Sequence, residues 1–515
     1  MSKNLSVTRR QFLNGAATAA AALAVARVVS GQQTEGSPGP SGPISVKSDR
    51  PTLLTEGPPG PSGPISIKGD RPTLLMGDEA VITGRPKPQR VGHGAKRLQV
   101  GNWTSADDSF TWQVDVPSSD EFMVTALTKS KGAVLELKAG SQKLERAVET
   151  NWDRIEIGRL RFDKGIHELT LRATKPGGRM EFYSLELVSP AMERQLGQQA
   201  KEVRSDTAWM RKAKYGLQFH WTSTSMPRRG PRKNYLDATR DFPAEAFAQI
   251  VKDSGAGYAI VTTSNAEHYF PAPIKAIDRV LPGRTAQRDL VRDWIDALGK
   301  HGIPLILYYH CGHDDWKNPD GWWRHTGYDP KDPQKFLDNW CAITSEVGNR
   351  YGKGLAGWYF DDACVYYPLN PDFRRLTLAA KAGNPDRVVC YNPWVLPRST
   401  DFQDYLCGEG YEFLKAWDGL PADGTGIYTS GPYKGLQAHT NFVLERGWVH
   451  GGLNADIPAP QYKKEQFVQD MKAGIAHGIV PSVNMEIYQD GGVGEASLEF
   501  MKAVKQELSG KGSIQ

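Results

Sequence analysis

The sequence lacks the usual signals for a cysteine-based metal site, for nucleic-acid binding and for a membrane span. Its five cysteines lie far apart in the second half of the chain without a Cys-x-x-Cys pair, so no zinc or redox motif is visible. A net charge of +5 over 515 residues is too dilute for a nucleic-acid partner. Beyond the N-terminal segment, no apolar run approaches the roughly 20 residues of a membrane helix. We therefore expect a soluble mature protein.

The first 26 residues have the pattern of a twin-arginine export signal. Arg9 and Arg10 precede Phe12 and an alanine-rich apolar stretch at 15–29, which is too short and too weakly apolar to cross a bilayer. Residues 24–26, Ala-Val-Ala, supply a small-x-small cleavage site. A buried N-terminal helix is the alternative interpretation. The order of these features favours export to the periplasm or the extracellular space, and folding before export in a reducing compartment accommodates unpaired cysteines.

A duplicated segment rich in proline and glycine follows the predicted signal. The sequence Gly-Pro-Ser-Gly-Pro-Ile occurs at residues 39–44 and 60–65, and Asp-Arg-Pro-Thr-Leu-Leu occurs at 49–54 and 70–75. This density of proline and glycine does not support a packed core. We therefore expect residues 27–78 to form an extended linker.

Short alternating segments replace this composition between residues 79 and 190. Apolar and polar residues alternate, with turn residues between the segments, at 109–116, 133–138, 167–172 and 181–188. Such spacing is typical of the strands of a β-sandwich. The predicted domain resembles the jelly-roll modules that accompany glycosidases, in which Trp103 and Trp152 could stack on a sugar. A spacer without a ligand is the alternative.

From about residue 205 to residue 510, predicted strands alternate with predicted helices. The strands are the apolar runs at 215–220, 258–263, 304–309, 357–361, 388–391 and 479–484. This alternation is typical of parallel βα units, and about 300 residues suits one barrel with loop insertions. The sixth and seventh strands are weakly marked, between 402 and 450. The predicted fold class is α/β, a (β/α)8 TIM barrel over 205–510 preceded by an all-β sandwich domain.

Polar residues directly follow several of these strands. The catalytic groups of a parallel barrel lie at the carboxyl ends of its strands, whereas a face that packs on helices does not need polar side chains. The strand ends carry histidine, asparagine and acidic residues at His220, residues 265–268, residues 310–315, Asp361, Asp362 and Asn392. Their convergence on one rim predicts an active site there.

Four segments of this region resemble glycoside hydrolase family 29, the α-L-fucosidases. They are Lys-Tyr-Gly-Leu-Gln-Phe-His-Trp at 214–221, Gly-Ile-Pro-Leu-Ile-Leu-Tyr-Tyr at 302–309, Gly-Trp-Tyr-Phe-Asp at 357–361 and Ile-Val-Pro-Ser-Val-Asn at 479–484. The resemblance covers about residues 205–508 in order. It implies a retaining glycosidase that acts on a carbohydrate substrate without a cofactor or metal, and the twin-arginine segment predicts that this enzyme is exported. Three features depart from the family's pattern. Residues 264–270 hold one histidine instead of a pair, the family's Glu-Trp pair has no counterpart near 231–235, and no arginine occurs at 391–394.

The resemblance also implies roles for individual residues. Retaining hydrolysis needs a nucleophilic carboxylate and an acid about 5–5.5 Å away. Asp361, in the family's nucleophile segment, is the predicted nucleophile, and a helix cap is the alternative for Asp361 or Asp362. Glu409 is the first choice for the acid, Glu412 is the second and Glu267 is an outside candidate. The predicted substrate-binding residues are His220, Trp221, His268, His310, Asn392 and Trp394.

Two alternatives stay open at this point. His310, His313 and Asp314 have side chains suited to a metal ion, but they could equally bind sugar hydroxyls, and the family uses no metal. The departures from the family's pattern also permit a catalytically inactive glycan-binding protein. A second carboxylate near Asp361 would favour the enzyme, whereas an isolated Asp361 would favour the binding protein. The oligomeric state does not follow from the sequence.

Overall fold

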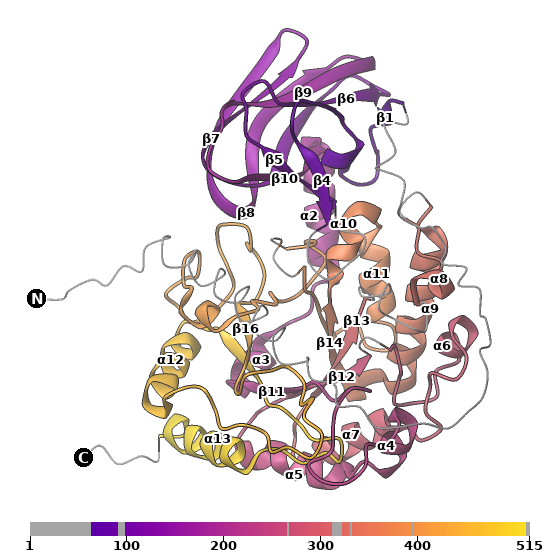
Figure 1. Ribbon diagram of the computed structural model, residues 1–515, viewed down its shortest axis with the longest axis vertical. Coiled ribbons are helices and arrows are strands. Elements are labelled where there is room, and N and C mark those ends of the chain that lie inside the picture. The colour runs from indigo at the N-terminus through magenta and orange to yellow at the C-terminus, as the bar shows by residue number, and fades with distance from the viewer. Residues whose placement is uncertain are drawn as a thin grey trace, which may run out of the picture.

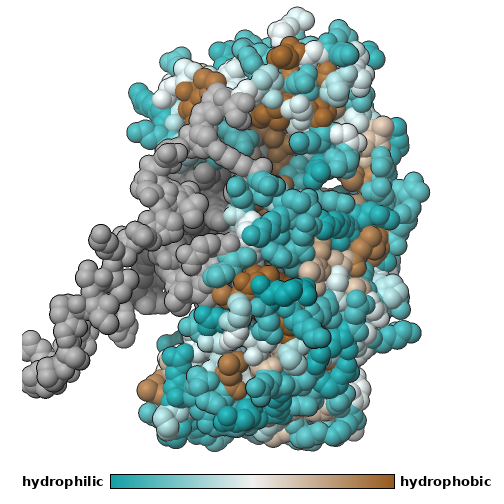
Figure 2. All heavy atoms as spheres, turned by 90° about the vertical axis from the view of Figure 1, so that its right-hand side faces the viewer, coloured by the Kyte–Doolittle hydropathy of each residue, from teal (hydrophilic) through white to brown (hydrophobic). Residues whose placement is uncertain are grey.

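The computed structural model describes residues 63–90, 98–264, 267–311, 322–329, 332–393, 396 and 398–510. The predicted export signal and the first part of the predicted linker lie outside these residues. Figure 1 shows a β-rich domain, coloured indigo to purple, above a larger α/β domain. The face shown in Figure 2 is largely hydrophilic, with hydrophobic residues in small groups. No helix in the described ranges is long and apolar enough to cross a membrane.

Hydrogen bonds join the strands of the β-rich domain into one curled sheet. The strands are β1 (Ile65–Ser66), β2 (Thr73–Met76), β3 (Val81–Thr83), β4 (Lys87–Arg90), β5 (Leu98–Trp103), β6 (Ser109–Val116), β7 (Asp120–Ala139), β8 (Gln142–Phe162), β9 (Gly165–Lys175) and β10 (Met180–Val188). Their order is β1-β6-β9-β7-β10-β5-β4, with β2 on β10, β3 on β6 and β8 on β7. In the core, the Phe110 ring lies 4.8 Å from Trp103 and 5.1 Å from Phe182 between centroids. The predicted β-rich region is confirmed, and a jelly-roll arrangement stays a prediction.

The last part of the predicted linker belongs to this sheet. Ile65 in β1 pairs with Val114 in β6, and Leu75 in β2 pairs with Leu185 in β10 and is fully buried. The prediction that the linker extends to residue 78 is therefore wrong for residues 65–78. Short apolar runs, Ile-Ser-Ile and Thr-Leu-Leu-Met, are enough to form strands here because β6 and β10 supply the hydrogen-bonding partners, although proline and glycine surround them.

The α/β domain contains a parallel sheet with the strand order β15-β14-β13-β12-β11-β17-β16. These strands are β11 (Gly216–Phe219), β12 (Ala259–Ser264), β13 (Leu305–His310), β14 (Leu355–Asp361), β15 (Val388–Tyr391), β16 (His439–Val443) and β17 (Val480–Asn484). The helices are α2 (Pro190–Val203), α3 (Ala208–Ala213), α4 (Tyr235–Asp241), α5 (Ala244–Ser254), α6 (Lys275–Val280), α7 (Leu290–Gly299), α8 (Trp322–Thr326), α9 (Gln334–Tyr351), α10 (Tyr366–Leu369), α11 (Phe373–Ala380), α12 (Lys464–Ala476) and α13 (Glu495–Leu508). Helical turns of the 3-10 type occur at η1 (Gly77–Glu79), η3 (Gly352–Gly354), η4 (Ala363–Val365) and η5 (Tyr411–Lys415).

An irregular segment, residues 404–410, hydrogen-bonds to both edge strands of this sheet. The Asp404 amide donates to the Val389 carbonyl in β15 at 2.8 Å, and the Gly410 amide donates to the Asn441 carbonyl in β16 at 2.8 Å. The segment therefore lies between β15 and β16 and brings the two edges of the curled sheet together. Strand β16 lies in the region 402–450, where the sequence marks strands only weakly.

Alternate residues of the parallel strands face opposite sides of the sheet. One side packs against the helices in a large apolar cluster. The other side encloses a smaller cluster that includes Ile260, Ile306, Tyr359 and Cys390. Gly216 in β11 lets the Tyr258 ring enter this inner space, because a Cβ on Gly216 would lie 2.2 Å from the ring. The inner side is therefore filled below the strand ends, and the candidate site lies above it.

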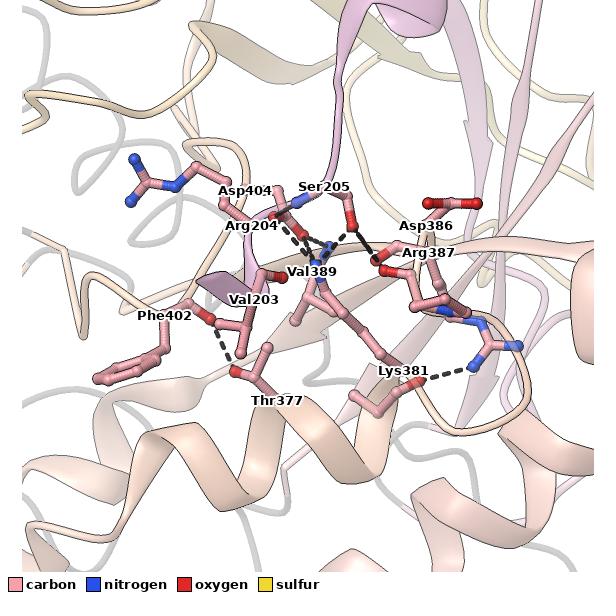
Figure 3. Close-up of polar contacts among 12 residues, drawn as sticks. Val203, Arg204, Ser205, Thr377, Lys381, Asp386, Arg387, Val389, Phe402 and Asp404 are labelled. Carbon is pink, nitrogen blue, oxygen red and sulfur yellow. Dashed lines mark hydrogen bonds and ion pairs between the residues drawn. The ribbon is translucent and has the colours of Figure 1, made fainter. Parts of the chain in front are cut away.

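A buried ion pair fixes the end of α2, the helix between the two domains, to the α/β domain (Figure 3). Lys381 follows α11 and donates to the Val203 carbonyl and to the Ser205 hydroxyl, both at 2.6 Å, and its Nζ lies 3.0 Å from Asp404 Oδ2. Asp404 also accepts the backbone amides of Ser205 and Val389 at 2.7 Å each. Burial raises the pKa of Asp404 and lowers the pKa of Lys381, because each charge has left water.

A second contact joins the β-rich domain to the chain around α10. Arg71 Nη1 donates to the Asn370 carbonyl at 3.2 Å, and Asn370 Nδ2 donates to the Pro72 carbonyl at 2.6 Å. The Tyr183 ring of β10 lies 5.8 Å from the Tyr367 ring between centroids. Since α10 follows β14, the β-rich domain lies beside loops at the carboxyl ends of the parallel strands.

Candidate active site

The carboxyl ends of the parallel strands bring several predicted site residues together. In the register of β13 and β14, His310 lies opposite Asp361. Opposite residues of paired strands point to the same face, as does Tyr308, two residues before His310. Asn392 directly follows β15, and Glu409 lies in the segment 404–410 beside it. The inner face of the sheet therefore carries two carboxylates, an imidazole, an amide and a phenol at one end.

Two side chains hold the Asp361 carboxylate. Asn392 Nδ2 donates to Asp361 Oδ1 at 2.5 Å, and the Tyr308 hydroxyl donates to Oδ2. Burial and the neighbouring Asp361 charge raise the pKa of Tyr308 well above its ordinary value, so its hydroxyl stays protonated. His310 Nε2 lies 3.8 Å from Oδ2 of Asp361 and from Oδ2 of Asp362. Tyr308 in β13 and Asn392 after β15 hold the Asp361 carboxylate at the strand ends, where its side chain is still 22% exposed.

A second carboxylate, Glu409, lies beside the first. Asn392 Nδ2 is 3.3 Å from Glu409 Oε2 and 2.5 Å from Asp361 Oδ1, so the two oxygens are no farther apart than the sum of these distances. The bound applies to this one pair of oxygens, and it permits the roughly 5–5.5 Å between carboxyl groups that retaining hydrolysis needs. The absence of a side chain at Gly408 permits this position, because a Cβ there would lie 2.0 Å from the His439 carbonyl oxygen.

The other two predicted acids have different surroundings. Glu412 lies in η5 with its carboxylate close to Gly410, and burial raises its pKa. Glu267 is half-buried after β12. Glu409, by contrast, shares the Asn392 amide with Asp361. Geometry therefore favours Glu409 among the three predicted acids.

His220 offers a hydrogen-bond acceptor at the same end of the sheet. Asn484 Nδ2 donates to the Trp448 carbonyl at 3.1 Å, which turns Asn484 Oδ1 toward His220 Nδ1 at 2.7 Å. Nδ1 therefore carries the hydrogen and Nε2 carries a lone pair, which the Gln218 amide nitrogen approaches to 3.5 Å. Burial lowers the pKa of His220 to about 4, so the ring is neutral near pH 7. The imidazole lies 4.7 Å from the Tyr308 ring between centroids, next to the residue that holds Asp361.

Trp221 and His268 lie on the helical side of the site. The buried Trp221 ring packs 4.9 Å from Phe242 and 6.2 Å from Trp294 between centroids. His268 stacks on Trp322 at 4.4 Å. Trp221 and His268 also line a small pocket. Aromatic packing explains the burial of both rings, and sugar contact stays a prediction for both residues.

Three residues that the sequence suggested, Trp394, His313 and Asp314, lie outside the described residues. Within the described ranges, no group of three or more His, Cys, Asp and Glu side chains is arranged to hold a metal ion. His310, the third member of the alternative metal site, lies between Asp361 and Asp362 instead.

Sequence reasoning missed a buried acidic group beyond β16 and β17. Glu486 Oε2 lies 3.3 Å from His450 Nδ1, and the Glu445 carboxylate accepts the Glu486 amide at 3.0 Å. Burial raises the pKa of Glu445 to about 7. The group holds the loop that carries Trp448, whose ring lies 5.3 Å from the His220 ring. The sequence could have pointed to Glu486 through its position, two residues beyond the end of β17. Residues two apart on a strand face the same side, so Glu486 lies on the same side as Asn484.

Comparisons with known proteins agree with the resemblance in the sequence. The α-L-fucosidase family model matches residues 233–415, a range that contains Asp361, Asn392 and Glu409. No curated protein matches the chain. Similar solved structures include α-L-fucosidase isoenzyme 1 from Paenibacillus thiaminolyticus, with 18% identity over 60% of this chain and 76% of that one and a TM-score of 0.44. A family 29 α-L-fucosidase from Bacteroides thetaiotaomicron has 16% identity over 59% and 74%, with a TM-score of 0.42.

A third similar structure is an endo-fucoidan hydrolase from glycoside hydrolase family 107. It has 15% identity over 61% of this chain and 54% of that one, with a TM-score of 0.44. The match to the family model supports a glycoside hydrolase, and its range includes the two neighbouring carboxylates.

Proposed function

We propose that the chain is an exported, retaining glycoside hydrolase of the α-L-fucosidase kind that acts on glycans. One observation carries the proposal: a single amide, Asn392 Nδ2, lies within hydrogen-bonding distance of both Asp361 and Glu409. Two carboxylates that share one donor can lie at the short separation that direct attack by one of them needs, roughly 5–5.5 Å between the carboxyl groups. The same proximity argues against the isolated Asp361 expected of a glycan-binding protein.

Asp361 acts as the nucleophile in this proposal, and Glu409 acts as the acid and then the base. Glu409 gives its proton to the glycosidic oxygen while Asp361 attacks the anomeric carbon, which forms a covalent glycosyl ester and frees the leaving alcohol. Glu409 then takes a proton from water, which attacks the same carbon and releases Asp361. Tyr308 and Asn392 favour the ionised form of Asp361 because they donate hydrogen bonds to it. His220 Nε2 offers its lone pair to a sugar hydroxyl.

The barrel itself is a second part of the proposal. Residues 205–510 form a closed (β/α)8 barrel in which the segment 404–410 takes the sixth position, between β15 and β16. The hydrogen bonds of this segment to both edge strands support closure, since an open sheet would leave those edges unpaired. An experimental structure in which β15 and β16 are not bridged by residues 404–410 would contradict it.

Export by the twin-arginine route is the third part, and it rests on the sequence around Arg9 and Arg10. The variant Arg9→Lys/Arg10→Lys should accumulate inside the cell, because the route recognises the arginine pair. Cell fractionation with an antibody measures this, and Lys3→Arg serves as a control that changes a basic residue outside the pair. Normal export of the double variant would exclude this route.

A panel of aryl glycosides, beginning with 4-nitrophenyl α-L-fucopyranoside, tests the catalytic proposal with the purified protein. Asp361→Asn should lower kcat by about 10⁴-fold or more, because loss of a covalent nucleophile has effects of this size. Glu409→Ala should also be slow, and added azide should restore turnover because this anion attacks the glycosyl ester without a base. Glu412→Ala is the matched control and should keep its activity.

The outcomes separate the alternatives. Full activity of Asp361→Asn, or a loss in Glu412→Ala with normal Glu409→Ala, contradicts the assignment of the carboxylates. Binding of fucosides without turnover of any aryl glycoside would favour the glycan-binding protein.

A further inference from the structure

We infer that Asn392 is a positioning residue that sets the geometry and the protonation of the two carboxylates, an inference that rests on the proposed function. The backbone of Asn392 is held on both sides, since its amide donates to the Phe360 carbonyl and its carbonyl accepts the Ala363 amide, each at 2.7 Å. The residue is only 2% exposed. Asn392 is therefore fixed in place and has little surface for direct contact with a sugar.

The two carboxylates determine the orientation of the Asn392 amide. Asp361 Oδ1 and Glu409 Oε2 are both acceptors when ionised, so the NH₂ group faces them and the amide oxygen does not. The two hydrogens of one NH₂ group point in different directions, and one hydrogen is directed to each carboxylate. The shorter contact, 2.5 Å against 3.3 Å, goes to Asp361. Asn392 therefore couples the position of the acid to that of the nucleophile.

This arrangement assigns a position to the catalytic proton. Glu409 Oε2 accepts from Asn392, so the proton that Glu409 transfers to the leaving oxygen is carried on Oε1. Once that proton has left, Glu409 is an anion, and the hydrogen bond from Asn392 becomes charge-assisted and stronger. The same amide thus favours the ionised Glu409 that must act as the base in the second step. Asp361 stays ionised because Asn392 and Tyr308 both donate to it.

The pH dependence of kcat/KM tests this role. Hydrogen bonds to an ionised carboxylate lower its pKa, so Asn392→Ala should raise the pKa of both Asp361 and Glu409. Both limbs of the bell-shaped profile should move to higher pH, measured on the aryl glycoside that the unaltered protein hydrolyses fastest. We expect kcat to fall about 10²-fold, the effect of losing one donor to a developing charge, with little change in KM. A raised KM with both limbs in place would show a sugar contact instead and would overturn the inference.

A matched variant controls for the loss of a buried amide. Asn384 is a buried residue at the opposite end of β14, where its Nδ2 donates to the Leu355 carbonyl at 3.4 Å. Asn384→Ala should leave both limbs in place, since Asn384 contacts neither carboxylate. If Asn392→Ala does not fold, Asn392→Ser replaces it, because one hydroxyl hydrogen cannot serve two carboxylates. Limbs that move equally in the Asn384 and Asn392 variants would overturn the inference.

The variant Asp361→Asn distinguishes failure of the inference from failure of the proposed function. If Asp361→Asn still hydrolyses the substrate, the proposed function fails whatever Asn392 does. If Asp361→Asn is inactive while Asn392→Ala keeps both limbs of the profile, the proposed function stands and only the positioning role is overturned.

Discussion

Breaking the buried ion pair between Lys381 and Asp404 should strongly destabilise the fold, because almost no solvent reaches the charge that is left behind. The Lys381 side chain is 4% exposed and the Asp404 side chain is 1% exposed. Asp404→Asn keeps the size of the side chain, but it leaves Lys381 buried without a counter-charge. Its NH₂ group would also face N–H donors, because Asp404 accepts hydrogen bonds from the Ser205 and Val389 amides and from Lys381. Removing one partner of a buried pair costs about 3–5 kcal/mol, and we expect a loss of this size in the free energy of unfolding.

Urea unfolding followed by circular dichroism and tryptophan fluorescence measures this loss. The double variant Lys381→Met/Asp404→Asn should be more stable than the sum of the two single losses implies, with a coupling energy of at least about 1 kcal/mol. The exposed pair of Lys502 and Glu499, at 2.8 Å, is the matched control, and Glu499→Gln should change stability by less than about 0.5 kcal/mol. A loss below about 1 kcal/mol for Asp404→Asn, or strict additivity, would refute the reasoning.

Three further predictions concern buried groups away from the carboxylates. Burial raises the pKa of Glu445 from 4.5 to about 7, so the folded protein binds a proton there that the unfolded chain has released, and the free energy of unfolding should fall as pH rises between these values. In Glu445→Gln, the free energy of unfolding from urea titrations should depend less on pH in this range. An unchanged dependence on pH would contradict the prediction. Gly216→Ala should destabilise the protein by about 1–3 kcal/mol, because the new Cβ would collide with the Tyr258 ring. Gly197→Ala in α2, where a Cβ meets nothing within 4 Å, should instead stabilise it by about 0.5–1 kcal/mol. Melting temperatures that shift in the same direction for both variants would refute this. Arg387 donates to five backbone carbonyls, so Arg387→Met should cost at least about 3 kcal/mol in urea unfolding, and a loss below about 1 kcal/mol would mean that water replaces the guanidinium.

Local sequence patterns determined most of the parallel strands. Apolar runs such as 304–309 and 357–361 are strands because a parallel sheet is buried on both faces and needs nearly continuous apolar residues. The same argument missed β16, because His439, Thr440 and Asn441 are polar. These residues are buried through specific partners, since His439 contacts the Cys407 carbonyl at 2.7 Å and the Ser482 hydroxyl at 2.8 Å. Such partners come from distant parts of the chain.

The position of Asp361 at a strand end also followed from the sequence, but its surroundings did not. Tyr308 could have been suggested by its spacing of two residues from His310 on one strand, yet its hydrogen bond to Asp361 depends on the register of β13 and β14. Asn392 lies between two carboxylates that are 31 and 17 residues away along the chain. No local pattern encodes that arrangement.

The sequence by itself determined most of the parallel strands along the chain and the position of Asp361 at the end of one of them. Only the tertiary structure decided that Glu409, and not Glu412, lies beside Asp361. The reason is the path of the chain at Gly408 and Gly410, whose positive φ angles of 59° and 136° direct the two glutamates to different places. Residues 65–78 likewise joined the β-rich sheet only because strands far along the chain offered them hydrogen-bonding partners.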